Sequence, residues 1–311
     1  MSKEAIEIHQ ISEENLIAAL GPLRGHLKAT SVLWMHVLGA PVLEGLIIKG
    51  WSPSSARTFR DFCAKRDLRE VLLRIDKYGQ RWTDRRGGYL LPVEQVGEVV
   101  RELKRDGILA MTLEPVSPYS DRYGLVAVTE PGHGSITVEI VGPGFDVSDI
   151  LRADLQAHER FVFTGVGQQN SRSAELAWRC THLISAGDYH ESVNQRLIKI
   201  GARLKDSAFP RSIKQSSRQA RSALRDSAIE YLSRTEQTLL LKHLDRYIPI
   251  SEKRLSTVVR CVVGMLGGLG NYGIHLGPTS FSASFTKTGR LVFWDFFPAR
   301  VAEAEALYGG G

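Results

Sequence analysis

The chain has 311 residues, which is enough for one large domain or two of ordinary size. Hydrophobic residues make up 43% of it and charged residues 24%, as in a globular protein with a sizeable core. The formal charge of +6 favours anionic partners, but it does not choose between a nucleotide, a nucleic acid and a phosphorylated metabolite. The sequence has no run of about 18 apolar residues, so we expect no membrane-spanning helix.

The first part of the chain alternates helical and strand patterns. Apolar residues recur at spacings of three and four where we expect helices, and they form short runs where we expect strands. The expected elements are a helix over 13–39, a strand at 41–48, a helix over 54–66, a strand at 71–75 and an amphipathic helix over 92–105.

The second part is richer in strands at both ends and helical in the middle. Strands are expected at 108–113, 123–129 and 135–141, and a hairpin at 280–286 and 290–296 closes the chain around a glycine-containing turn. Between them, residues from about 171 to 266 are polar and helical in pattern. The sequence therefore predicts an α+β fold of two lobes, 1–107 and 108–311, with the helical segment inserted in the second lobe.

The number and spacing of the cysteines indicate the redox environment in which the protein is expected to work. Cys63, Cys180 and Cys261 are far apart and lack the spacing of a metal site or a disulfide framework. The N-terminus has no basic segment followed by an apolar one, so no secretory signal is visible. We expect a cytoplasmic protein in a reducing environment.

The basic residues concentrate between Arg196 and Arg260, inside the expected helical insertion. Between Tyr189 and Tyr231 the only aromatic residue is Phe209, so a nucleic acid would find few stacking platforms there. Two interpretations stay open: a solvated helical face, or a surface that meets an anion such as a nucleic acid.

Arg74 stands in the middle of the apolar strand pattern Leu72-Leu-Arg-Ile75. An arginine in such a strand costs desolvation unless it has a partner. One interpretation is a buried ion pair with nearby Asp76 or with a glutamate elsewhere. The other is a guanidinium aimed at phosphates, which it can bind with two parallel hydrogen bonds.

A loop rich in arginine and glycine follows that strand. Adjacent glycines such as Gly87 and Gly88 let backbone N–H groups approach a phosphate closely, and Arg86 adds positive charge. A Gly-Gly pair alone is more often a simple turn. Its position shortly after Arg74 favours a phosphate cradle.

Three carboxylates fall at expected strands, namely Glu114, Glu139 and Asp295. Buried acids on strands are uncommon unless they are paired or bind a cation. For Mg²⁺ bound with a nucleotide, one or two carboxylates suffice together with phosphate oxygens. The alternative is that each carboxylate pairs with an arginine of the core.

Taken in order, these segments resemble the ATP-grasp domain of phosphoenolpyruvate synthase and pyruvate phosphate dikinase, mainly over residues 25–161 and the final hairpin. The similar segments are Gly25-His-Leu-Lys28-Ala-Thr-Ser31, Gly39-Ala-Pro-Val-Leu-Glu-Gly45, Leu73-Arg74-Ile-Asp76, Arg86-Gly87-Gly88-Tyr89, Leu113-Glu114-Pro115, Val138-Glu139-Ile-Val-Gly142 and the hairpin from Phe281 to Asp295. The resemblance implies a two-lobed ATP-grasp-like fold that binds ATP and Mg²⁺.

The resemblance also implies roles for single residues. Lys28, Arg74 and Asp295 would form the catalytic set, with Lys28 and Arg74 on the ATP phosphates. The adenine hinge would include Glu114. Asp295 would face the metal or the phosphates, and Glu139 would be a second metal-facing residue. Arg86, Gly87, Gly88 and Glu139 would complete the nucleotide contacts.

The sequence departs from the family at Ser282 and Ser284, which stand where the family has an Asp-x-Glu pair of metal ligands. The leading hypothesis is an ATP-dependent phosphotransferase or ligase, passing a phosphoryl group to an unidentified anionic or small-molecule acceptor. A non-catalytic nucleotide sensor or interaction module on the same fold is the second hypothesis. Nucleic-acid binding through the basic insertion is the third.

Overall fold

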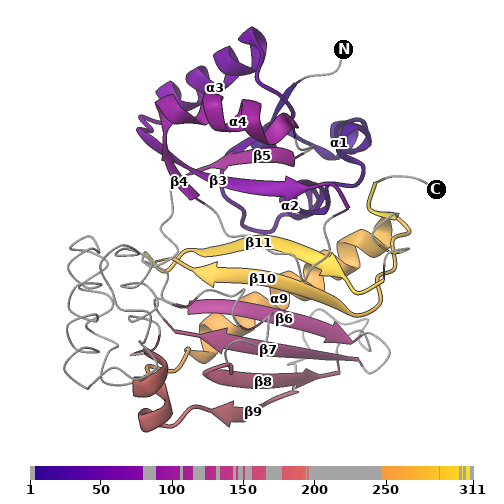
Figure 1. Cartoon of the computed structure of the whole chain (residues 1–311). Helices are drawn as coiled ribbons and strands as arrows, with labels where there is room; N and C mark the ends of the chain where they lie inside the picture. The colour runs from indigo at the N-terminus through magenta and orange to yellow at the C-terminus, as the bar shows by residue number, and fades with distance from the viewer. Residues whose placement is uncertain are drawn as a thin grey trace, which may run out of the picture.

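The computed structural model describes residues 4–79, 89–105, 108–114, 123–130, 134–142, 145, 150, 156–165, 177–193, 195, 247–286, 288–300, 303 and 306–308. Two antiparallel sheets organise this part of the chain, each at the centre of one lobe (Figure 1). The α+β class and the two-lobed arrangement predicted from the sequence are therefore confirmed. None of the described helices is long and apolar enough to cross a membrane.

The first sheet, sheet A, has five strands. Their order across the sheet is β1 (Ala5–Glu7), β2 (Gly45–Ile48), β5 (Ile108–Leu113), β3 (Glu70–Lys77) and β4 (Tyr89–Pro92). The strand β5 pairs with both β2 and β3, so sheet A extends to Leu113, beyond the lobe boundary predicted at residue 107.

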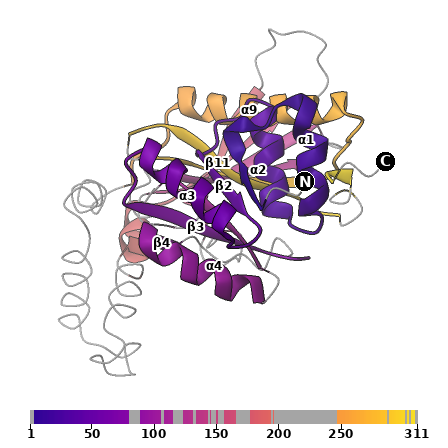
Figure 2. The same cartoon turned by 90° about the horizontal axis from the view of Figure 1, so that it is seen from above.

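Helices cover both faces of sheet A. On one face lie α3 (Pro53–Lys65) and α4 (Val96–Arg105), and on the other α1 (Glu13–Leu20) and α2 (Leu27–Val37) (Figure 2). The start of α3 follows from its sequence, because the Ser52 hydroxyl accepts a hydrogen bond from the Ser55 N–H and Pro53 occupies the first turn. The helix expected over 13–39 is broken into α1 and α2 by the short 3₁₀ turn Gly21–Leu23.

The second sheet, sheet B, has six strands. Their order is β11 (Leu291–Pro298), β10 (Thr279–Phe285), β6 (Tyr123–Glu130), β7 (Ser135–Val141), β8 (Glu159–Thr164) and β9 (Ala177–Leu183). The helix α9 (Glu252–Asn271) runs along one face of sheet B (Figure 1). The expected hairpin at 280–286 and 290–296 is confirmed as β10 and β11.

The helical insertion predicted over about 171–266 is only partly described. Its strand β9 pairs with β8, so the segment is not wholly helical and extends sheet B by one strand. The pattern between 171 and 266 missed this strand because β9 is exposed along nearly its whole length and lacks apolar alternation. Residues 196–246, which carry most of the basic stretch, lie outside the described residues.

The helix α2 joins the two lobes. Every residue from Leu27 to Met35 is buried, as expected for a helix with neighbours on all sides. It contacts β3 in sheet A and β11 in sheet B. After the end of α2, the Pro41 carbonyl accepts a hydrogen bond from the Phe293 N–H of β11 at 2.8 Å. The lobes thus share a core that runs through α2.

Gly45 lets β2 and β5 approach each other closely. A Cβ at this position would lie 2.4 Å from the Thr112 carbonyl oxygen, which is backbone and cannot turn aside. We expect Gly45→Ala to lower the free energy of unfolding by about 1–3 kcal/mol, measured by urea unfolding. The control is Gly264→Ala in α9, where a Cβ meets no heavy atom within 4 Å. The control is expected to gain about 0.5–1 kcal/mol, and equal effects in the two variants would contradict the close approach.

Candidate functional site

Arg74 and Asp295 form an ion pair between the two lobes. The Arg74 Nη2 atom lies 2.7 Å from Asp295 Oδ2, and the side chains are 11% and 2% exposed. Ser282 on β10 donates its hydroxyl to Asp295 Oδ1. The sequence allowed two interpretations of Arg74, a buried ion pair or a contact with phosphates. A buried pair exists, but its acid is Asp295 of the other lobe and not Asp76 or a glutamate.

A β-bulge in β11 completes this contact. The register passes from Ser282 opposite Asp295 to Ala283 opposite Phe293, which leaves Trp294 as the extra residue. Because β11 is an edge strand, the Trp294 carbonyl can accept a hydrogen bond from Arg74 Nη1 at 2.7 Å. The guanidinium also lies 5.5 Å from the Trp294 ring centroid. We call Arg74, Asp295, Ser282 and Trp294 the Arg74 clasp.

Lys28 and Asp76 lie at the N-terminal end of α2. Lys28 Nζ donates to the Ile75 carbonyl at 3.1 Å, and Asp76 Oδ2 accepts the Ala29 N–H at 2.8 Å. Asp76 thereby caps α2 from β3 and satisfies one of the N–H groups of the first turn. Both side chains are almost fully buried, with 1% exposure for Lys28 and 0% for Asp76.

The pKa of Asp76 depends on two charged residues of the Arg74 clasp. Burial raises the pKa of Asp76 to about 7, while the Ala29 N–H, Lys28 and Arg74 act in the opposite direction. Asp295 raises the pKa further through like charge. The three residues predicted as catalytic, Lys28, Arg74 and Asp295, therefore surround one buried carboxyl. The sequence named Asp76 only as a possible partner of Arg74 and missed its capping role.

Glu114 lies at a second contact between the lobes. Its carboxylate accepts the Glu44 N–H at 2.8 Å and pairs with Arg290 at 3.2 Å. Arg290, beside the β10–β11 turn, also donates to the Val42 carbonyl at 3.2 Å. The resemblance implied an adenine hinge here. In the structure the carboxylate links the end of β5 to sheet B, and the hinge role stays a prediction.

Glu139 is far from Asp295. One register row crosses sheet B through Asp295, Ser282, Val126, Glu139, Arg160 and His182. Three strand spacings thus separate Glu139 from Asp295, about 14 Å. Mg²⁺ binds its ligands at about 2.1 Å, so at this separation the two carboxylates do not coordinate the same ion. Glu139 pairs with Arg160 at 2.6 Å instead.

The remaining predicted residues, Arg86, Gly87 and Gly88, lie outside the described part of the chain. In that part, no group of three or more His, Cys, Asp or Glu side chains is arranged to hold a metal ion.

The face of sheet B opposite α9 carries half-buried and exposed polar side chains over β7 and β8. Ile136, Val138 and Ile140 point into the core, so the alternating residues Thr137 and Glu139 point to the opposite face, where they are only half-buried. Arg160, whose side chain is 46% exposed, lies on the same face. We call this surface, from the Arg74 clasp to Arg160, the open face of sheet B. The sequence could not predict which residues lie side by side across this face, because the order of the strands depends on contacts between residues far apart in the chain.

No protein-family model matches the sequence, and no curated protein matches it. Among solved structures, D-alanyl-alanine synthetase A from Vibrio cholerae aligns at 9% identity and a TM-score of 0.42, over 88% of this chain and 55% of that one. Biotin carboxylase from Campylobacter jejuni, solved with β,γ-ATP, aligns at 10% identity and a TM-score of 0.40, over 92% and 43%. The ATP-grasp ligase PsnB aligns at 8% identity and a TM-score of 0.35, over 90% and 60%.

The chain spans from under half to three-fifths of the length of these three proteins. At such identities and TM-scores, the likeness transfers neither an activity nor a residue role to this chain.

Proposed function

We propose that this chain is an ATP-binding protein of the ATP-grasp type, with the nucleotide on the open face of sheet B beside the Arg74 clasp. The observation that carries the proposal is the convergence of Lys28, Arg74 and Asp295 from two lobes. The sequence resemblance selected these three residues from segments far apart in the chain. The same face carries Arg160, a half-exposed cation that a phosphate could reach.

The reaction proposed with this site is phosphoryl transfer from ATP to an anionic or small-molecule acceptor, as in a phosphotransferase or a ligase. Such reactions depend mainly on positioning and on neutralising the charge of the transferred group. Arg74 can neutralise the charge of the transferred group if a phosphate replaces Asp295 as its partner. The acceptor would lie on the open face beyond the phosphates.

The described residues do not fit a magnesium site in their present arrangement. Asp295 Oδ2 is bound by Arg74 and Oδ1 by Ser282, and Ser282 and Ser284 replace the expected acids. This observation favours the second candidate function, a non-catalytic nucleotide sensor on the same fold. Both candidates require ATP to bind, and they differ in whether a product forms.

A thermal-shift series tests the binding. At an ATP concentration a hundredfold above Kd, binding adds about 2.7 kcal/mol of stability, which raises Tm by about 4 °C for a chain of this size. ATP, ADP and GTP are compared with and without Mg²⁺ or Mn²⁺, and bound samples are analysed for ADP and phosphorylated products. Product formation identifies an enzyme, whereas a shift without product identifies a sensor. No shift with any nucleotide would overturn the proposal.

A pair of variants locates the site. Arg160→Ala removes a cation from the open face, so we expect ATP affinity to fall about tenfold, as for the loss of one charge-assisted hydrogen bond. Arg260→Ala is the matched control, because Arg260 is an exposed arginine on α9, at the opposite face of sheet B. Equal affinities for the two variants would exclude the open face.

A further inference from the structure

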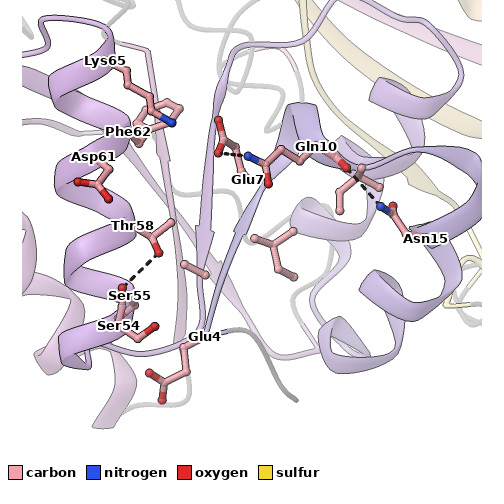
Figure 3. Close-up of a pocket in the computed structure, with 13 residues that line it drawn as sticks. Glu4, Glu7, Gln10, Asn15, Ser54, Ser55, Thr58, Asp61, Phe62 and Lys65 are labelled. Carbon is pink, nitrogen blue, oxygen red and sulfur yellow. Dashed lines mark hydrogen bonds between the residues drawn. The ribbon is translucent and has the colours of Figure 1, made fainter.

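A groove separates β1 from α3 at the edge of sheet A. Its volume is about 430 Å³, and its walls come from β1, from the first turn of α1 and from one side of α3 (Figure 3). Neither its residues nor its position belongs to the open face of sheet B. We call it the β1–α3 groove.

One wall is the open edge of a strand. Among the described strands, β1 pairs only with β2. The Lys49 N–H donates to the Glu4 carbonyl at 2.8 Å, so Glu4 and Lys49 form a hydrogen-bonded pair of the antiparallel ladder. Hydrogen-bonded pairs alternate along such a ladder, so Ala5 directs its backbone N–H and C=O, and Glu7 its N–H, away from β2. The Glu7 carbonyl begins the 3₁₀ turn Ile8–Gln10. An extended chain could add to this edge as a further strand.

The opposite wall is the polar side of α3. Ser54, Thr58, Asp61 and Lys65 follow one another at spacings of four, three and four, which places them on one side of the helix. Phe59 lies on the side that packs against sheet A. A slot between an edge strand and a helix is the geometry in which several peptide-binding domains take an extended peptide by strand addition.

The charges of the groove favour a basic occupant. Its lining contains the carboxylates of Glu4, Glu7 and Asp61 and one ammonium group, that of Lys65. Arg66 offsets part of the charge of Glu7, with Nη2 3.3 Å from Oε1, and Lys49 offsets part of the charge of Glu4. The chain as a whole carries +6, so a basic peptide would be drawn to this groove by local charge and not by the net charge.

We propose that the β1–α3 groove binds an extended peptide segment of a partner protein, a segment that carries lysine or arginine and adds a strand to β1. Backbone hydrogen bonds to Ala5 and Glu7 hold the peptide in register. Asp61 and Glu4 select its basic side chains, and the hydroxyls of Ser54 and Thr58 face its remaining polar groups. This site is independent of nucleotide binding.

Fluorescence anisotropy on the full chain tests the proposal. The probes are fluorescein-labelled heptapeptides that alternate valine with lysine, in both registers. Two control sets carry glutamate in place of lysine, or N-methyl groups on alternate backbone nitrogens. We expect saturable binding of a lysine peptide, no binding of the glutamate peptides and at least tenfold weaker binding after N-methylation, because the edge loses its donors.

Variants on the protein side assign the binding to the groove. Ala5→Pro removes the outward N–H and is expected to weaken the lysine peptide about fivefold to tenfold. Asp61→Lys, on the helix wall, should weaken it to a similar degree. Glu98→Lys is the matched charge control, because Glu98 is exposed on α4 and outside the groove. If Ala5→Pro fails to fold, the N-methylated probes and Asp61→Lys still decide the outcome.

Three results overturn the proposal. The first is no saturable binding by any lysine peptide at millimolar concentration, and the second is equal binding by the N-methylated probes. The third is a dimer in sedimentation that Ala5→Pro dissociates, because β1 would then pair with a second copy of this chain and not with a partner peptide.

Discussion

Replacing Asp295 by alanine is expected to lower the free energy of unfolding by about 3–5 kcal/mol, because the substitution leaves the Arg74 guanidinium buried without its counter-ion. The two side chains are 11% and 2% exposed, so little water is available to replace the carboxylate. The Ser282 hydroxyl loses its carboxylate acceptor in the same step and keeps its contact with the backbone carbonyl at 295. Urea unfolding of the wild type and the variant, monitored by tryptophan fluorescence, measures the difference.

A double-mutant cycle separates the ion pair from packing. Arg74→Met and Asp295→Leu each leave one charge of the pair buried without its partner, whereas the double variant removes both charges of the pair. We therefore expect the double variant to recover most of the stability that either single variant loses. Additive losses would show that the pair contributes little, and a loss below about 1 kcal/mol for Asp295→Ala would show that the pair is solvated.

The same double variant clarifies tests of nucleotide binding. Arg74→Ala alone is a poor test of nucleotide binding, because it leaves Asp295 buried without its counter-ion and is expected to destabilise the fold. The double variant keeps the contact between the lobes and removes the cation. If ATP affinity falls in the double variant with Tm unchanged, then the Arg74–Asp295 pair acts on the nucleotide and does not merely support the lobes.

Local sequence pattern predicted most of the described strands. The expected strand at 108–113 is β5 (Ile108–Leu113), because a short apolar run bounded by polar residues carries its own signal. The pattern could not tell which sheet β5 would join, since pairing with β2 and β3 depends on contacts distant in sequence. For the same reason the lobe boundary at residue 107 was drawn one strand too early.

In the candidate site, too, local pattern identified single residues but not their partners. Arg74 was identified because an arginine in an apolar strand needs a partner, and that argument is local. Its partner Asp295 lies 221 positions away, and only the register of β10 and β11 brings it there. Glu139 and Asp295 were predicted as metal-facing residues from their places in strands and from the family resemblance. The strand order of sheet B separates them, and no sequence pattern encodes that order.

Asp76 is expected to make the stability of the chain fall as pH rises from about 4 to about 7. Burial raises its pKa in the folded protein to about 7, from the ordinary 3.8. In this interval the folded state holds the proton that the unfolded state has lost. The contribution of Asp76 is therefore fully present below the unfolded pKa and is lost as pH rises through the folded pKa, with a slope of up to about 1.4 kcal/mol per pH unit.

The Asp76→Asn variant isolates this carboxyl, because asparagine can still accept the Ala29 N–H but does not titrate. Free energies of unfolding at pH 5, 6, 7 and 8 should fall more steeply with pH in the wild type than in the variant. Asp61→Asn is the control, since Asp61 is an exposed aspartate on α3 and should leave the wild-type slope unchanged. Parallel curves for the wild type and Asp76→Asn would mean that Lys28 and Arg74 keep the carboxyl ionised throughout. The cap on α2 would then be a permanent charge next to the Arg74 clasp, and nucleotide binding there would not depend on this proton.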